Sequence, residues 1–205
     1  MSRRPRLQAR LAALALVGLV LSATAIAHPL ADAARRQVGV TVRYDPAYVR
    51  LGYPGGDVPA DRGVCTDVVV RALRTQGIDL QQRIHQDKRA HPEAYPRQWR
   101  HLAADPHIDH RRVPNQTTWF TRQGWSRPVA QARGDYRAGD IVAWRLDNGL
   151  LHIGIVSDHK AGDGTPLVLH NIARGTREEN VLLRWRIIGH YRPALPPVSA
   201  AQARR

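Results

Sequence analysis

The sequence is poor in several residue types that would point to a particular class of protein. Its 205 residues contain one cysteine, one methionine and one phenylalanine. A single thiol excludes an internal disulfide, so Cys65 needs another explanation, and nucleophilic catalysis is the sharpest available. Lysine is also scarce: Lys88 and Lys160 are the only two, so almost all of the 31 basic residues are arginines.

The chain also lacks any concentrated block of charge. Its formal net charge is +14, yet no run of five or six like charges occurs and no basic motif is interleaved with aromatic residues. We therefore expect no nucleic-acid partner. Scattered positive charge suits peptidoglycan or another anionic envelope polymer. The simpler alternative is that the charge reflects arginine-rich composition alone. The sequence does not define an oligomeric state.

No apolar run is long enough for an ordinary membrane-spanning helix, which needs roughly 20 residues. The one long run, Leu11 to Leu21, follows four arginines and precedes the small residues Ala25 and Ala27. This order predicts a cleavable signal peptide over residues 1–27, with cleavage after Ala27 or, as the alternative, after Ala25. No cysteine closely follows the run, which excludes a lipoprotein anchor. We expect a periplasmic or secreted protein with no stable membrane anchor after cleavage; an uncleaved anchor is the competing interpretation.

Removal of the signal leaves 178 residues, a suitable length for one domain. It also removes four arginines and no acid, which lowers the formal charge to +10. We expect a single domain over residues 28–192 and a flexible basic tail over 193–205, where proline, alanine and arginine dominate.

Helical patterns come first along this domain and strand patterns later, which predicts an α+β fold. The expected helices are residues 28–37, 65–76, 79–91 and 115–123, the last with Asn115 as its N-cap. The expected strands are residues 38–44, 140–146, 151–156, 166–171, 180–185 and 187–192. Turn residues at 147–149 and 162–164 favour antiparallel hairpins. The stretch from 92 to 114 shows no clear period and is expected to be irregular.

The first turn of the helix that starts at Cys65 is a suitable place for a reactive thiol. The positive end of a helix and a nearby imidazolium both lower a thiol pKa from its usual value of about 8.5. Apolar Val68 and Val69 share the helical face of Cys65, which places the sulfur on the buried side. A lone buried cysteine is more often an inert small hydrophobe, so the interpretation depends on finding a base.

Two of the ten histidines occupy predicted strands, where a base would be held rigidly. His152 begins an apolar strand, and Gly154, two residues on, leaves room on the same face. His170 ends another strand and could fix the tautomer of His152 if the strands pair. Asn171 could do the same, although it points to the opposite face from His170. Each histidine also has a structural interpretation as a satisfied core residue.

The sequence contains a set of motifs over roughly residues 35 to 192: Tyr53-x-x-Gly56, Gly63-x-Cys65, Tyr136-Arg137-Ala138-Gly139-Asp140-Ile141-Val142-Ala143-Trp144, His152-Ile153-Gly154-Ile155-Val156 and Leu169-His170-Asn171. In these motifs it resembles the NlpC/p60 superfamily of papain-like cysteine peptidases that act on cell walls. With Cys-Thr-Asp-Val-Val and Gly189-His190-Tyr191 included, the chain is most similar to a secreted bacterial family of unknown function related to that superfamily.

The resemblance implies a papain-like core in which the cysteine helix packs on an antiparallel sheet. Carried over to this chain, Cys65 would be the nucleophile, His152 the general base and acid, and His170 the orienting third residue. Tyr53, twelve residues before the cysteine, matches a tyrosine that lies near the thiol in many members. The implied activity is hydrolysis of an amide bond, foremost in peptidoglycan stem peptides, with no cofactor and no metal.

Two departures bear on the substrate. Many members have Asp-Cys-Ser where this chain has Val64-Cys65-Thr66, and the acidic Asp67 is displaced. The segment from 80 to 135 is longer than a minimal core needs. Two alternatives remain: an acyltransferase or thioesterase on the same fold, which would require an apolar cleft that this arginine- and histidine-rich segment does not suggest, and a non-catalytic envelope-binding module. His107, Asp109 and His110 invite a metal interpretation, but their spacing matches no metal motif, and a solvated loop is the better expectation.

Overall fold

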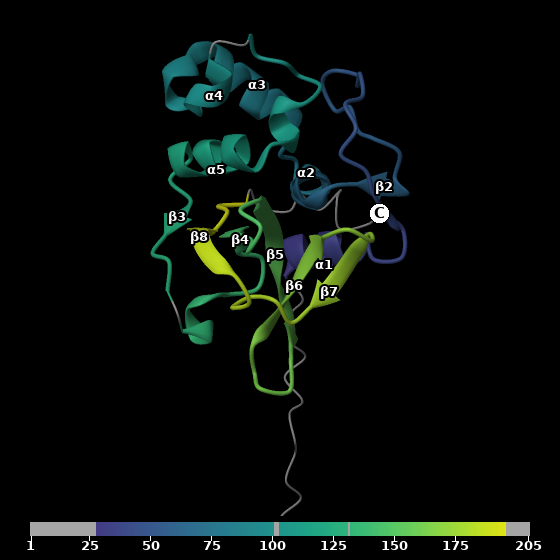
Figure 1. Ribbon diagram of the computed structural model, residues 1–205, viewed down its shortest axis with the longest axis vertical. Coiled ribbons are helices and arrows are strands. Elements are labelled where there is room, and N and C mark those ends of the chain that lie inside the picture. The colour runs from purple at the N-terminus through teal and green to yellow at the C-terminus, as the bar shows by residue number, and fades with distance from the viewer. Residues whose placement is uncertain (1–27, 101–102, 131, 196–205) are drawn as a thin grey trace, which may run out of the picture.

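The computed structural model describes residues 28–100, 103–130 and 132–195 (Figure 1). The predicted signal peptide and residues 196–205 of the predicted tail lie outside this range. Leu195, at the end of the described chain, packs against the main core. Within the described residues, no helix is long and apolar enough to span a membrane.

The main sheet is antiparallel throughout, with strand order β3-β8-β4-β5-β6-β7. Its strands are β3 (Ser126–Arg127), β4 (Ile141–Arg145), β5 (Leu151–Lys160), β6 (Pro166–Asn171), β7 (Thr176–Glu179) and β8 (Arg186–Tyr191). Two short strands, β1 (Arg43–Tyr44) and β2 (Arg62–Gly63), form a separate parallel pair.

The helices gather at one face and one end of this sheet (Figure 1). They are α1 (Pro29–Arg35), α2 (Cys65–Thr75), α3 (Leu80–Ala90), α4 (Arg97–Arg100) and α5 (Val113–Arg122), with single 3-10 turns η1 (Pro92–Ala94), η2 (Asp109–Arg111) and η3 (Arg133–Asp135). Helices α1 and α2 pack against β5 and β6. Helices α3 to α5 extend beyond the end of the sheet.

Alternation along the strands divides the core into two parts. The larger part lies between the sheet and the helices; it includes Cys65 of α2 and Ile153 and Ile155 of β5. The smaller part covers the opposite face and includes Trp144 of β4 and Leu182. The indole Nε1 of Trp144 donates a hydrogen bond of 2.9 Å to the Leu182 carbonyl, so even the polar atom of this large side chain is satisfied.

Most of the predicted elements are present. The expected helices correspond to α1, α2, α3 and α5, and hairpins join β4 to β5 and β5 to β6. Gly149 and Gly164 complete the two hairpin turns with φ of 82° and 80°, values that favour glycine. The mixed helical and antiparallel-sheet architecture is therefore confirmed.

The segment from 92 to 114, expected to be irregular, contains α4 and the 3-10 turns η1 and η2. Three further expectations about single elements were wrong. Only Arg43 and Tyr44 of the predicted strand 38–44 are extended in a ladder, and Val38, Val40 and Val42 are 43%, 51% and 52% exposed. Residues 180–185 form a turn over the smaller core instead of a strand, and the last strand before β8 is β7.

The third error concerns the N-cap of α5. The helix starts at Val113, with Pro114 in its first turn, where a missing N–H costs nothing. Asn115 is fully buried inside the helix and donates a hydrogen bond of 3.0 Å to the Asp109 carbonyl.

Candidate functional site

Cys65 is the first residue of α2. Val64 before it is extended, with φ −116° and ψ −178°, and its backbone N–H donates a hydrogen bond of 2.7 Å to Asp67 Oδ2. An acidic side chain at the third helical position thus stabilises the turn into the helix, both by this bond and by its charge at the positive helix end. The position of the thiol is set by this local cap.

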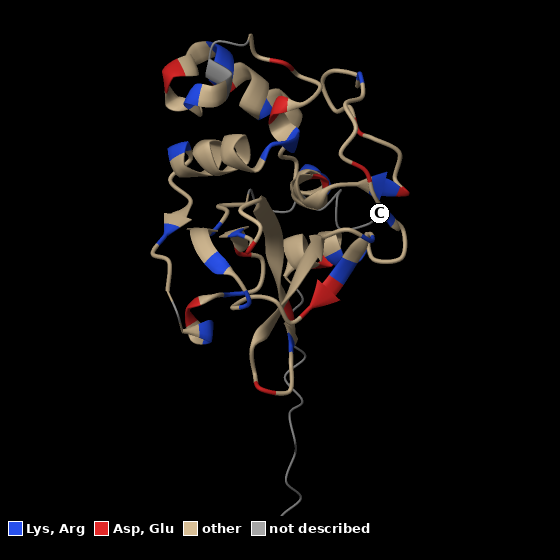
Figure 2. Cartoon of the chain, in the orientation of Figure 1, with Lys and Arg blue, Asp and Glu red and all other residues tan. Residues whose placement is uncertain are grey.

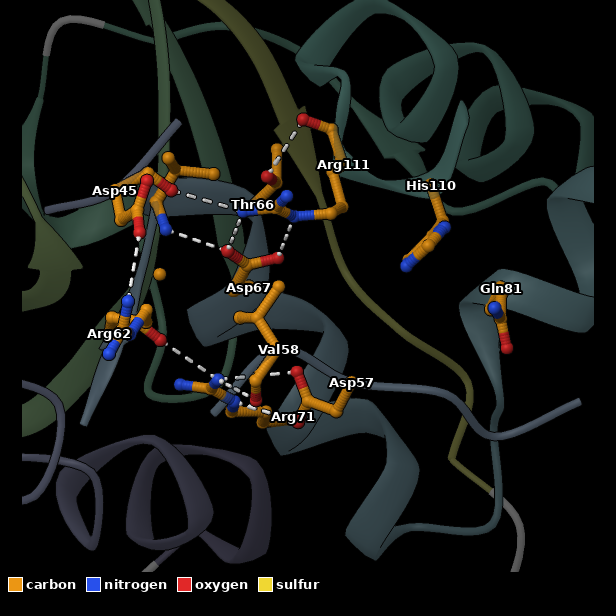
Figure 3. Close-up of polar contacts among 12 residues, drawn as sticks. Asp45, Asp57, Val58, Arg62, Thr66, Asp67, Arg71, Gln81, His110 and Arg111 are labelled. Atoms are coloured by element: carbon orange, nitrogen blue, oxygen red, sulfur yellow. Dashed lines mark hydrogen bonds and ion pairs between the residues drawn. The ribbon is translucent and has the colours of Figure 1, made fainter. Parts of the chain in front are cut away.

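The same carboxylate forms a buried ion pair with Arg111 of η2. Asp67 Oδ1 lies 2.9 Å from Arg111 Nε and Asp67 Oδ2 lies 2.9 Å from Arg111 Nη2 (Figure 3). The side chains are 3% and 2% exposed. Arg111 also donates to the backbone carbonyls of Ala47 and Asp45, and its own carbonyl accepts a bond from Thr66 Oγ1. One polar network therefore joins the start of α2 to two distant loops.

A pocket of about 280 Å³ opens at Cys65. Its apolar walls come from Pro46, Val64, Ile108, Val113, Pro114 and Leu151. Tyr44 also lines it, and burial together with the nearby Cys65 and Asp67 raises the pKa of the Tyr44 hydroxyl to about 12. Segment 80–135, expected to be polar, thus contributes apolar residues to the pocket.

The thiol itself is 5% exposed. Burial raises the pKa of Cys65 to about 12, against the opposing effect of backbone hydrogen bonds from Ile153, Thr66 and Cys65 itself. Those N–H groups stabilise negative charge on sulfur, while the apolar surroundings oppose it. At neutral pH the sulfur is therefore protonated, beside donors that would serve a developing anion.

The structure brings the two predicted strand histidines together. His152 Nε2 lies 2.9 Å from His170 Nδ1, and both side chains are buried. Behind them, His170 Nε2 lies 3.1 Å from Glu179 Oε2, although the ring N–H is not aimed at that oxygen. Burial, with a further contribution from His170, lowers the pKa of His152 to about 3. Burial also lowers the pKa of His170, and Glu179 opposes that shift.

The histidine pair and the thiol lie on either side of β5. His152 is the cross-strand partner of Trp144, and its ring packs against Trp144 and Trp185 on the smaller-core face. Ile153, the next residue, belongs to the larger core and hydrogen bonds Cys65 through its backbone. Pairing of β5 with β6 starts only at Ile155. The sulfur therefore lies beside a part of β5 whose β6 edge is unpaired. In the described chain, neither histidine is hydrogen bonded to Cys65.

The auxiliary candidates lie in three different environments. Asn171 Nδ2 donates a hydrogen bond of 2.9 Å to the Gly63 carbonyl, which holds the segment before Cys65; it is not the partner of His152. Asp67 is the helix cap and the partner of Arg111. Tyr53 packs edge-on against His85, with ring centroids 5.1 Å apart, and does not line the thiol pocket.

Three residues near the site were not identified from the sequence. Tyr44 lines the pocket in place of Tyr53, Arg111 pairs with Asp67, and Glu179 lies behind His170. The apolar alternation before Tyr44 is a local pattern that marks this segment, but such alternation is typical of a strand and predicted one here. No local signal distinguishes Arg111 from the many other arginines, because its partner is 44 positions away.

Residues 107–110, expected to be a solvated loop, are partly buried and stabilise the fold: Asp109 and His110 are buried. His107 Nδ1 accepts a hydrogen bond of 3.1 Å from the Leu51 backbone, and Asp109 forms a buried ion pair of 2.9 Å with Lys88. Among the residues that the structure describes, no group of three or more histidine, cysteine or acidic residues could hold a metal ion.

The thiol at the start of α2 and the histidine pair on β5 and β6 define the candidate site, and comparison with known proteins shows which family has this sequence. The model of a family described as "Domain of unknown function (DUF1287)" matches residues 31–193, and the chain belongs to that family. It is also 60% identical over 163 residues to the "Uncharacterized protein YijF" of Escherichia coli (strain K12), a match that covers 80% of each chain. No solved structure matches the chain.

Proposed function

We propose that this protein is an exported cysteine hydrolase that cleaves an amide bond, foremost in peptidoglycan stem peptides. The observation that carries the proposal is Cys65, which lies in a pocket wall at the first residue of a helix and whose sulfur is met by the backbone N–H groups of Ile153 and Thr66. A papain-like arrangement of cysteine helix and antiparallel sheet is part of the same proposal, as is the periplasmic or secreted location.

The proposed chemistry is acyl transfer to water. His152 accepts the thiol proton, the sulfur attacks the amide carbon, and backbone N–H groups stabilise the oxyanion. His152 then gives its proton to the leaving amine. Water, deprotonated by His152, attacks the thioester, which releases the acid and restores the thiol. His170 orients His152 throughout.

This mechanism requires the His152 side chain to turn from its contact with Trp144 toward the sulfur. Resting hydrogen bonds in active sites are often long or absent and form only when substrate is bound. In this structure the His152 ring lies on the opposite face of β5 from the sulfur, so the first residues of β5 must rotate together with the side chain for this step. Both groups are neutral in the resting state, so the proton moves only as the sulfur attacks.

Digestion of purified peptidoglycan by wild type, Cys65→Ser and His152→Ala, read by mass spectrometry, tests the proposal. We expect new stem-peptide fragments with wild type alone. His170→Ala should lower turnover more than substrate binding. Identical product patterns from wild type, Cys65→Ser and His152→Ala would refute the catalytic role of this site.

An acyltransferase or thioesterase is the second candidate, and the apolar lining of the pocket favours it. Leu151, Ile108 and Val113 would suit an acyl chain. A series of p-nitrophenyl esters of increasing chain length distinguishes the two activities. A thioesterase should prefer longer chains and lose that preference in Ile108→Ser, whereas a stem-peptide hydrolase should show little dependence on chain length.

The rate of iodoacetamide labelling against pH separates both enzymes from a non-catalytic binding module. The high pKa and 5% exposure of Cys65 are what such a module would retain. In the enzyme, a peptide substrate analogue should slow labelling at pH 7, because the bound peptide lies over the sulfur. A labelling rate that the analogue does not change, together with wall binding retained in Cys65→Ala, would identify a binding module.

A further inference from the structure

A separate cavity of about 360 Å³ lies at the β3 and β8 edge of the main sheet. It is lined by Arg127, Pro128, Ala130, Gly134, Asp135, Arg137, His190 and Arg192. Strands β8 and β4 separate β3 from β5, so the cavity is distinct from the thiol pocket. Its volume lies near the lower end of the range for small-ligand sites, roughly 300–1,000 Å³.

Two of the lining arginines form no ion pair in the part of the chain that the structure describes. The Arg127 side chain on β3 donates a hydrogen bond to the Ser126 carbonyl. The Arg137 backbone N–H donates a hydrogen bond to Asp140, without involving the guanidinium. Neither guanidinium has an ion-pair partner among the described residues. Figure 2 shows a basic position on β3 and, at η3, acidic and basic positions next to one another. Two unpaired arginines beside one cavity are the usual means of binding an oxyanion.

The other two basic residues are fixed in place by Asp140 at the back of the cavity. Asp140 is 1% exposed and accepts hydrogen bonds of 2.7 Å from Arg192 Nε, Arg192 Nη2 and His190 Nε2. Burial alone would raise the pKa of Asp140, but these partners outweigh it and lower that pKa. His190 Nδ1 lies 3.1 Å from the Pro128 carbonyl oxygen, so contacts at both ring nitrogens hold the ring in place.

One carboxylate opposes this positive charge. Asp135 lines the cavity and is exposed, and its backbone carbonyl accepts a bond of 3.3 Å from Arg192. Arg127 and Arg137 together outweigh it, while Asp140 is already neutralised by Arg192. The cavity therefore retains a net positive charge on a rigid base.

We propose that this cavity binds an oxyanion, either the phosphate or the carboxylate of a small ligand or of a polymer end, through Arg127 and Arg137. Arg192 and His190 form the fixed floor of the site. The proposal does not depend on Cys65 or on any hydrolytic activity.

Isothermal titration of the full chain with inorganic phosphate and, separately, with citrate tests the proposal. We expect saturable binding of at least one probe, which weakens as salt rises. Each of Arg127→Ala and Arg137→Ala should weaken binding about tenfold or more, the size expected for one lost bond to a charged group. Arg137→Lys should retain most of the affinity for phosphate. The probe that binds more tightly identifies the oxyanion as phosphate or carboxylate.

Two variants provide matched controls. Arg186→Ala removes an exposed arginine from β8, the strand that contains His190, but at a position outside the cavity. This variant should bind like wild type. Cys65→Ser should also bind like wild type, which separates this site from the proposed hydrolase. Absence of binding by both probes, or equal weakening by Arg186→Ala and Arg137→Ala in folded protein, would overturn the proposal.

Discussion

The two sides of β5 are built by different means. On the helix side, buried polar contacts position the thiol: Asp67 caps the helix start and pairs with Arg111, and Asn171 holds the Gly63 carbonyl. On the other side, aromatic packing surrounds His152, whose ring contacts Trp144 and Trp185. A polar network fails when one partner is removed, whereas packing tolerates small polar changes at its edge. We therefore expect the thiol side to be the more sensitive of the two.

The largest expected effect is that of Asp67→Ala. It leaves the Arg111 guanidinium buried without its ion-pair partner and removes the helix cap, so the free energy of unfolding should fall by about 3–5 kcal/mol. Urea denaturation measures the loss. Arg43→Ala, at an ion pair whose side chains are 58% and 42% exposed, is the control and should cost less than about 1 kcal/mol. A similar loss in both variants would contradict the claim that this network positions the thiol.

Asn171→Ala tests the second contact on the thiol side. The substitution removes the 2.9 Å donor of the Gly63 carbonyl, which keeps a second bond from the Asp45 N–H, so we expect a loss of about 0.5–1.5 kcal/mol. The segment before Cys65 should loosen as well, so iodoacetamide should label Cys65 faster than in wild type. An unchanged labelling rate despite the stability loss would show that Asn171 does not control access to the sulfur.

Acid should act on both sides of β5, through His152 on the histidine side and through His110 of η2 on the helix side. Burial lowers the pKa of His152 to about 3 and of His110 to about 4, below the ordinary value of 6.5. The unfolded chain therefore takes up protons first, so the stabilising contribution of each neutral histidine is complete above pH 6.5 and is lost as pH falls toward 3 or 4. Each group should contribute up to about 1.4 kcal/mol per pH unit across that window.

Urea denaturation between pH 7 and pH 4 checks this dependence. The slope should become shallower in His152→Gln and in His110→Gln. Equal slopes in wild type and both variants would mean that neither buried histidine contributes.

The smallest expected effect is that of Glu179→Gln. Glu179 is 31% exposed and opposes the lowering of the His170 pKa, so removing its charge should lower that pKa further. Stability should change by less than about 1 kcal/mol. An NMR titration of the ring protons measures the pKa, and Cys65 labelling serves as the control that should not move. A labelling change would mean that the two sides of β5 are coupled.

The regular parts of the fold were predictable because their patterns are local. The apolar runs of β4, β5 and β6 and the face of α2 follow directly from residue spacing. Strand β7 was missed because Thr176–Glu179 has no apolar alternation; its acidic residues are stabilised by distant partners, Glu178 by Arg35 and Glu179 by His170. The spacing from Cys65 favoured Tyr53, but the pairing of β1 with β2 places Tyr44 opposite Gly63, two residues before Cys65, and Tyr44 lines the pocket instead. Contacts across long stretches of chain are not encoded in local periodicity.

The burial of Cys65 has a consequence for its chemical lifetime. The thiolate is the form that exchanges with disulfides and reacts with oxidants, and a thiol with a pKa of about 12 holds almost none of it at neutral pH. With one cysteine in the chain, no second thiol can resolve an oxidised sulfur. A sulfur enclosed by α2 and β5 would therefore keep its reduced form in an oxidising compartment, where an exposed unpaired thiol would soon be capped.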